Sequence, residues 1–196
     1  SNPNQVTITG EITNPKGESV IFSNQDTSYS TTANEDGTFS ITFNLDSATY
    51  LNFQHGVEHT AMFVRPGDKI KLSIDTEKFD ETIEYKGSLS SSFLAKKYLL
   101  EEGNDFFGKV FYMSNGEDYK AALDSFKIDV INEFGKITDS AFIKSEITNI
   151  DKDRYIADTQ LLSKFLDDDG CFLNQTKNTT LFNLADNLTE ENIYVL

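Results

Sequence analysis

Cysteine, proline and tryptophan are scarce in this chain, which has one cysteine, three prolines and no tryptophan among 196 residues. The single cysteine, Cys171, cannot form an internal disulfide. No second cysteine lies three residues away, as a redox-active Cys-x-x-Cys motif requires. We expect Cys171 to be a small, half-buried thiol near a helix end. The sequence therefore predicts no thiol–disulfide chemistry within this chain.

Basic residues are also scarce, with 17 lysines and arginines against 32 aspartates and glutamates and a formal net charge of −15. Lys96-Lys97 is the only adjacent basic pair in the sequence. Phosphate backbones are bound by clustered lysines and arginines, so nucleic acid is excluded as a partner. No apolar run approaches the ~20 residues of a membrane-spanning helix, so we expect no transmembrane segment.

Motifs of catalysis and of cofactor binding are missing from the sequence. It has no G-x-S-x-G elbow, no S-x-x-K motif and no glycine-rich phosphate loop. The serines from Ser88 to Ser92 are typical of a helix start, where side-chain oxygens cap unpaired backbone N–H groups. We therefore expect no catalytic residue, no cofactor and no enzyme activity in this chain.

His55 and His59 are the best metal candidates, and they are weak ones. They enclose Gly56-Val57-Glu58, so two imidazoles and a carboxylate lie within five residues. The zincin pattern places Glu directly after the first His, on a helix, whereas here glycine follows and the segment looks like a hairpin tip. We expect exposed loop histidines and no metal.

Two acidic turns invite a calcium interpretation, one ending at Gly37 and one at Gly170. A calcium-binding EF-hand loop needs a bidentate glutamate six residues after its glycine. Phe43 and Thr176 occupy those positions. A hairpin turn and a helix end are therefore the favoured interpretations.

The first half of the chain alternates apolar and polar residues with period two, which is typical of half-buried strands. Seven or eight strands are predicted, around residues 6–12, 19–22, 29–33, 38–45, 50–53, 61–64, 70–74 and 82–85. Asn34-Glu35-Asp36-Gly37 is predicted to close a hairpin through a two-residue primed turn. Arg65-Pro66-Gly67-Asp68 is predicted to be another turn.

The period changes to that of a helix near Ser88. Helices are predicted from Phe93 to a stop at Gly103, from a capping box at Ser114 to Gly135, and from Ile143 to Gly170, with a break near Asn149-Ile150-Asp151. Strands followed by helices indicate an α+β fold. We expect an N-terminal antiparallel β-sandwich over residues 1–88, followed by a helical subdomain over residues 89–196.

Four segments together resemble a known family. They are Ile8-Thr9-Gly10-Glu11-Ile12, Asn34-Glu35-Asp36-Gly37-Thr38-Phe39, Phe63-Val64-Arg65-Pro66-Gly67-Asp68-Lys69-Ile70-Lys71-Leu72 and Tyr85-Lys86-Gly87-Ser88. This set is similar to the N-terminal (DUF4369-type) domain of Bacteroidetes TlpA/AhpC-TSA-like thiol-disulfide oxidoreductases, over about residues 5–102. The helices that follow are similar to the segment before the thioredoxin domain of those proteins.

The resemblance implies an envelope lipoprotein that faces the periplasm, with a Cys-x-x-Cys in a later thioredoxin fold. This chain contains no Cys-x-x-Cys, so no catalytic residue is carried over. We expect either a fragment of a longer protein or a protein that has lost its catalytic half.

Two functions follow as hypotheses. The first is a non-catalytic module that positions a thioredoxin-like domain, dimerises or recognises a partner. The alternative is an envelope module that binds glycans or peptides through aromatic side chains such as Tyr29, Tyr50, Phe53 and Tyr85. Burial of these aromatics would remove the basis of the alternative.

Overall fold

The computed structural model describes residues 2–104 and 116–150. The chain divides into two compact units, Ser1–Leu99 and Leu100–Leu196. The first unit contains eight strands: β1 (Gln5–Thr13), β2 (Ser19–Ser23), β3 (Ser28–Thr32), β4 (Thr38–Asn44), β5 (Thr49–His55), β6 (Glu58–Val64), β7 (Lys69–Asp75) and β8 (Glu84–Lys86). A short η1 (Thr76–Lys78) and α1 (Phe79–Thr82) separate β7 from β8.

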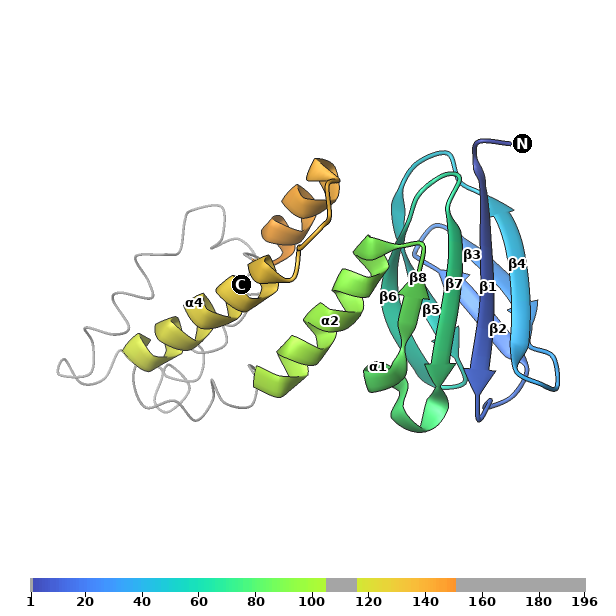
Figure 1. Ribbon diagram of the computed structural model, residues 1–196, viewed down its shortest axis with the longest axis horizontal. Helices are drawn as coiled ribbons and strands as arrows, with labels where there is room; N and C mark the ends of the chain where they lie inside the picture. The colour runs from blue at the N-terminus through green and yellow to red at the C-terminus, as the bar shows by residue number, and fades with distance from the viewer. Residues whose placement is uncertain (1, 105–115, 151–196) are drawn as a thin grey trace, which may run out of the picture. The chain divides into compact units, whose positions relative to one another are not determined.

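The strands form two four-stranded sheets, in the orders β4-β1-β7-β8 and β3-β2-β5-β6 (Figure 1). All the pairs are antiparallel except β1 and β7, which run parallel. Burial alternates along the strands, as period-two sequences dictate. The predicted α+β class, with a β-sandwich before helices, is confirmed.

The two sheets share one core. Phe22 of β2 and Phe53 of β5 are completely buried, and their rings lie 6.2 and 6.4 Å from that of Phe39 of β4, which belongs to the other sheet. Phe53 also stacks on Phe79 at 6.0 Å. Aromatic contacts between the inner faces therefore hold the sandwich together.

Gly10 and Phe39 make a close contact between strands β1 and β4. The two residues are direct partners in the β1–β4 register. A Cβ atom on Gly10 would lie 2.1 Å from the Phe39 ring. Only glycine leaves room for that ring, which covers the backbone of β1 from the neighbouring strand.

The predicted hairpin at Asn34 is wrong in two respects. Strands β3 and β4 lie in different sheets, so the turn connects the two layers. Its loop has three residues, because Gly37 N–H donates to the Asn34 carbonyl and Asn34 N–H donates to the Thr38 carbonyl. Gly37 has φ +80°, which fits a type I turn followed by a left-handed residue and not a two-residue primed turn.

Helix α2 (Leu89–Asn104) begins where the predicted change of period falls, and the boundary between the two units lies within it, eleven residues after the boundary predicted from the sequence. The predicted stop, Gly103, lies in its last turn. Helix α4 (Gly116–Asn132) buries Phe126 and Val130, and the next turn contains Gly135 at φ +49°, as predicted. The capping box at Ser114 lies outside the described residues.

Residues 140–150 form a further helix up to the limit of the description. Asp139 caps its start by accepting the Phe142 N–H at 3.0 Å. Phe142, Glu146 and Ile150 are buried, whereas Ile143 and Ile147 are half-buried. The helix begins three residues before its predicted start at Ile143. None of the described helices is both long and apolar enough to span a membrane.

Candidate functional site

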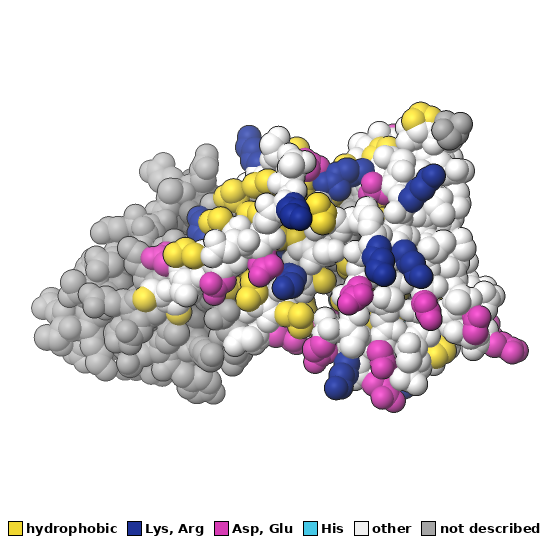
Figure 2. All heavy atoms as spheres, in the orientation of Figure 1, with side chains coloured by type: hydrophobic (Ala, Val, Ile, Leu, Met, Phe, Trp, Pro, Cys, Tyr) yellow, Lys and Arg dark blue, Asp and Glu magenta, His cyan; other side chains and the backbone are white. Residues whose placement is uncertain are grey.

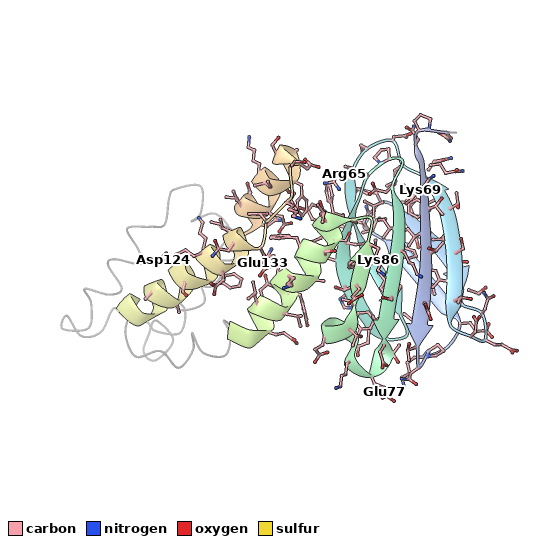
Figure 3. All side chains as sticks on the ribbon, viewed as in Figure 1. Arg65, Lys69, Glu77, Lys86, Asp124 and Glu133 are labelled. Atoms are coloured by element: carbon pink, nitrogen blue, oxygen red, sulfur yellow. The ribbon has the colours of Figure 1, made fainter. Side chains whose placement is uncertain are left out.

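The outer face of the sheet β4-β1-β7-β8 carries a shallow groove of about 700 Å³. We call it the lysine groove, and its lining residues are Gln5, Thr7, Thr9, Lys69, Ile70, Lys71, Lys86 and Gly87. Strand alternation explains its composition, because Ile70 and Leu72 point into the core and leave their lysine neighbours outside. Figure 3 labels Lys69 and Lys86 on this sheet.

The register of the sheet brings the three lysines together. Lys69 and Lys71 alternate on β7, and Lys71 lies directly opposite Lys86 of β8. Lys69 and Lys71 in turn face Thr7 and Thr9 of β1. Figure 2 shows dark blue side chains on the face of the sandwich that is turned to the viewer. A local cationic surface thus exists on a chain whose net charge is −15.

None of the three lysines forms an ion pair or a side-chain hydrogen bond with the described part of the chain. Two like charges directly opposite each other on neighbouring strands destabilise a sheet. The next row of the same face carries Glu11 and Glu84, on either side of Ser73. The groove therefore combines unpaired positive charge with a negatively charged border.

A second cluster fixes the start of α2 to the free edge of β6. Ser91 Oγ accepts the Phe63 N–H at 3.0 Å and lies 3.1 Å from the Phe63 carbonyl oxygen, to which it donates. One buried hydroxyl thus pairs both backbone groups of an edge residue, as a neighbouring strand would. Ser88 Oγ accepts the Ser91 N–H at 3.1 Å, so the predicted capping role of the serines is confirmed.

Arg65 extends this serine cluster. Its guanidinium donates to Ser90 Oγ at 2.8 Å and lies 4.8 Å above the centre of the Phe63 ring. The predicted turn is present, because Asp68 N–H donates to the Arg65 carbonyl and the Asp68 carboxylate accepts the Arg65 N–H at 2.8 Å. Partial burial raises the pKa of Asp68, against the opposing effect of that hydrogen bond. These contacts serve the structure, because Arg65 and Asp68, the two ends of the turn, are hydrogen-bonded to each other.

The two histidines do not form a site together. His55 is buried at the end of β5, and the expectation of an exposed loop histidine is wrong for it. Its Nε2 accepts the Lys16 N–H at 2.8 Å, and its Nδ1 lies 2.9 Å from the Ser19 carbonyl oxygen. Both ring nitrogens are therefore used to hold the connection between β1 and β2.

His59 is exposed, as expected, but it lies on strand β6 and not in a loop, opposite Gln54. His59 lies on the same face of the sheet as its partner Gln54. His55 is the next residue of β5 and points to the opposite face, so the two histidines cannot share an ion. The part of the chain that the structure describes contains no group of three or more side chains able to hold a metal.

The acidic turn before Gly37 uses its carboxylate locally. Asp36 accepts hydrogen bonds from the hydroxyl of Thr38 at 2.6 Å and from its backbone N–H at 3.0 Å. These bonds, the hydroxyl's first, lower the pKa of Asp36. The carboxylate fixes the turn, as the sequence indicates. The other acidic turn, at Gly170, and Cys171 lie outside the described residues.

The aromatic side chains proposed for ligand binding belong to the packing. Phe53 and Tyr85 are buried. Tyr29 stacks on Phe43 at 4.0 Å, and Tyr50 meets the Phe63 ring edge-on at 4.9 Å. Tyr29 and Tyr50 are half-buried, so full burial takes two of the four aromatics, Phe53 and Tyr85, out of a candidate binding surface.

The lysine groove is not apparent from adjacent basic residues, because none of its three lysines is next to another in the sequence. In a strand, the residues that share a face are two apart, and Lys69-Ile70-Lys71 has that spacing. The pairing of β7 with β8, which brings Lys86 alongside, is not visible in the sequence.

Comparison with family models, with curated proteins and with solved structures finds no match for this chain.

Proposed function

We propose that this chain is a non-catalytic module that positions an attached thioredoxin-like domain in the envelope of a Bacteroidetes cell. The observation that carries the proposal is the serine cluster, which fastens the first turn of α2 to the sandwich. Buried hydrogen bonds between Ser91 Oγ and both backbone groups of Phe63 set the direction in which this helix leaves the sandwich. A rigid exit is what a positioning module requires.

The other described features support the same role. Both ring nitrogens of His55 and the carboxylate of Asp36 hold local structure, so neither side chain serves as a free catalytic group. In the family that the sequence resembles, chemistry belongs to a later Cys-x-x-Cys domain. A periplasmic location and a lipid anchor are part of the same proposal and rest on the same resemblance.

The natural reading frame provides the first test. We expect a Cys-x-x-Cys thioredoxin-like segment to be encoded after Leu196, and a lipobox before Ser1. A reading frame that encodes neither of them would contradict the proposal.

The second test is an insulin reduction assay with dithiothreitol as the electron donor. The purified chain is expected to give no turnover above buffer, whereas a thioredoxin control precipitates insulin under the same conditions. Turnover that survives replacement of Cys171 by serine would show a chemistry that this proposal denies.

A further inference from the structure

We propose that the lysine groove binds a short, extended acidic segment of a partner polypeptide, with carboxylates at alternate residues. Binding at this groove does not depend on the positional role of the chain. The proposal rests on the spacing of the lysines, their lack of partners, the polar groups beside them and the acidic border.

The spacing of the lysines suits an extended peptide. Lys69 and Lys71 are two residues apart on one strand, which places their Cα atoms about 7 Å apart. Alternate side chains of any extended peptide repeat at the same distance. Lys86 lies on the neighbouring strand, about 5 Å from Lys71, and adds a second positive charge at that position. A segment that lies along β7 would therefore meet an ammonium group at each of its carboxylates.

Electrostatics also favours an anion between two of the lysines. Lys71 and Lys86 face each other directly, and neither has an ion-pair partner among residues 2–104 and 116–150. A carboxylate placed between them turns a repulsive pair into two attractive ones. No packing requirement explains the lysines, because both side chains are exposed.

The rest of the groove can bind a peptide backbone. Thr7 and Thr9 stand beside Lys69 and Lys71 in the register of β1 and β7, and Gln5 continues the same row of β1. Their hydroxyl and amide groups both donate and accept hydrogen bonds. An extended segment offers backbone N–H and C=O groups that such side chains can pair.

The border of the groove favours a short segment over a membrane or a nucleic acid. Glu11 and Glu84 occupy the next row, and the chain as a whole carries a net charge of −15. Charges are screened beyond about 8 Å at physiological salt, so a ligand confined to the groove feels mainly the lysines. A bilayer or a long polyanion would extend over the acidic surroundings and be repelled.

The test uses fluorescence anisotropy with a fluorescein-labelled peptide in which glutamate and threonine alternate. We expect saturable binding that weakens as salt is added. The double variant Lys71→Gln with Lys86→Gln is expected to bind about tenfold more weakly, since two exposed ion pairs are lost. Lys71→Arg with Lys86→Arg keeps the charge and is expected to retain most of the affinity.

The matched control is Lys16→Gln with Lys78→Gln, which makes the same change of net charge at exposed positions outside the groove. It is expected to bind like the original chain. Equal losses in both double variants would overturn the proposal, because the effect would then come from net charge. Circular dichroism of each variant confirms that it is folded.

Three further probes separate the ligand classes. A peptide of the same composition, with its glutamates in one block, is expected to bind more weakly than the alternating one. Vesicles containing phosphatidylglycerol, and the acidic polysaccharide hyaluronate, are expected to bind more weakly still. Equal binding of the block peptide, or stronger binding of vesicles or hyaluronate through Lys71 and Lys86, would overturn the assignment to an extended acidic segment.

Discussion

The two faces of strand β7 differ in burial and charge, although they are built from alternate residues of the same segment. The inner face consists of Ile70, Leu72 and Ile74, each at most 3 % exposed and packed in the common core. The outer face presents Lys69 and Lys71. Their side chains have no ion-pair or hydrogen-bond partner in the described residues, and they lie next to a third lysine. One face is determined by packing, whereas the other departs from what stability alone would select.

This contrast separates residues that make the fold from residues that are available for function. A sheet of this kind needs only polar residues on its outer face, and threonine has a higher β propensity than lysine. Lysine side chains that repel each other and add nothing to the stability of the fold are therefore informative about binding. The following predictions test each side of the comparison.

The largest effect is expected in the core. Phe53→Ala removes a completely buried ring that contacts Phe22, Phe39 and Phe79, and we expect it to lower the free energy of unfolding by about 3–5 kcal/mol. Urea denaturation followed by circular dichroism measures the change. Val57→Ala, at a position 91 % exposed, should stay within about 0.5 kcal/mol. Similar losses for both variants would contradict the described core.

A smaller loss is expected at the serine cluster. Ser91→Ala leaves the backbone N–H of Phe63 without its hydrogen bond, which should cost about 1–3 kcal/mol. Hydrogen exchange is the sharper measurement, because the amide of Phe63 should lose protection while that of Ile8 in the other sheet keeps it. Ser30→Ala on β3, an exposed serine, is the control. Unchanged protection at Phe63 would show that Ser91 does not hold the edge.

Tyr85 is a buried residue whose hydroxyl does not contribute to the packing through a hydrogen bond. Its hydroxyl has no hydrogen-bond partner among the described residues, so Tyr85→Phe should raise the free energy of unfolding by roughly 1 kcal/mol. Burial also raises the pKa of the Tyr85 phenol. The unfolded chain releases this proton near pH 10 whereas the folded chain retains it, so stability falls as the pH rises above about 10.

The alkaline loss identifies the Tyr85 contribution. The remaining tyrosines are the same in both proteins, so the difference between the original chain and Tyr85→Phe isolates one phenol. We expect the two stability curves to diverge above about pH 10, with the variant losing less. Curves that stay parallel would mean that Tyr85 is accessible to water.

Much of the fold follows from the sequence, because period-two patterning and turn chemistry are local signals. Each of the eight strands overlaps a predicted one, although β6 starts three residues before and β8 two residues after its predicted start. The turn at Arg65 and the capping by Ser88 lie where the residues place them. The predicted hairpin at Asn34 is wrong because nothing local shows that β3 and β4 belong to different sheets. The parallel pairing of β1 with β7 is likewise a non-local property that no turn encodes.

The candidate site was harder to predict for the same reason. Lys86 joins Lys71 only through the pairing of β7 and β8, and Ser91 reaches Phe63 from 28 residues away. The burial of His55 cannot be predicted from its sequence neighbours, because they give no sign that its ring holds two distant backbone groups. Functional side chains on strands depend on register, which the sequence pattern leaves open.

The smallest effect is expected on the outer face, and its sign is what matters. Lys71→Thr removes one member of the opposed pair with Lys86 and introduces a residue with higher β propensity, so stability should rise by a few tenths of a kcal/mol. Thermal melts at low salt measure it, and the gain should shrink as salt screens the repulsion. A salt-independent loss of stability would show that Lys71 serves the fold, and the two faces of β7 would then follow one rule.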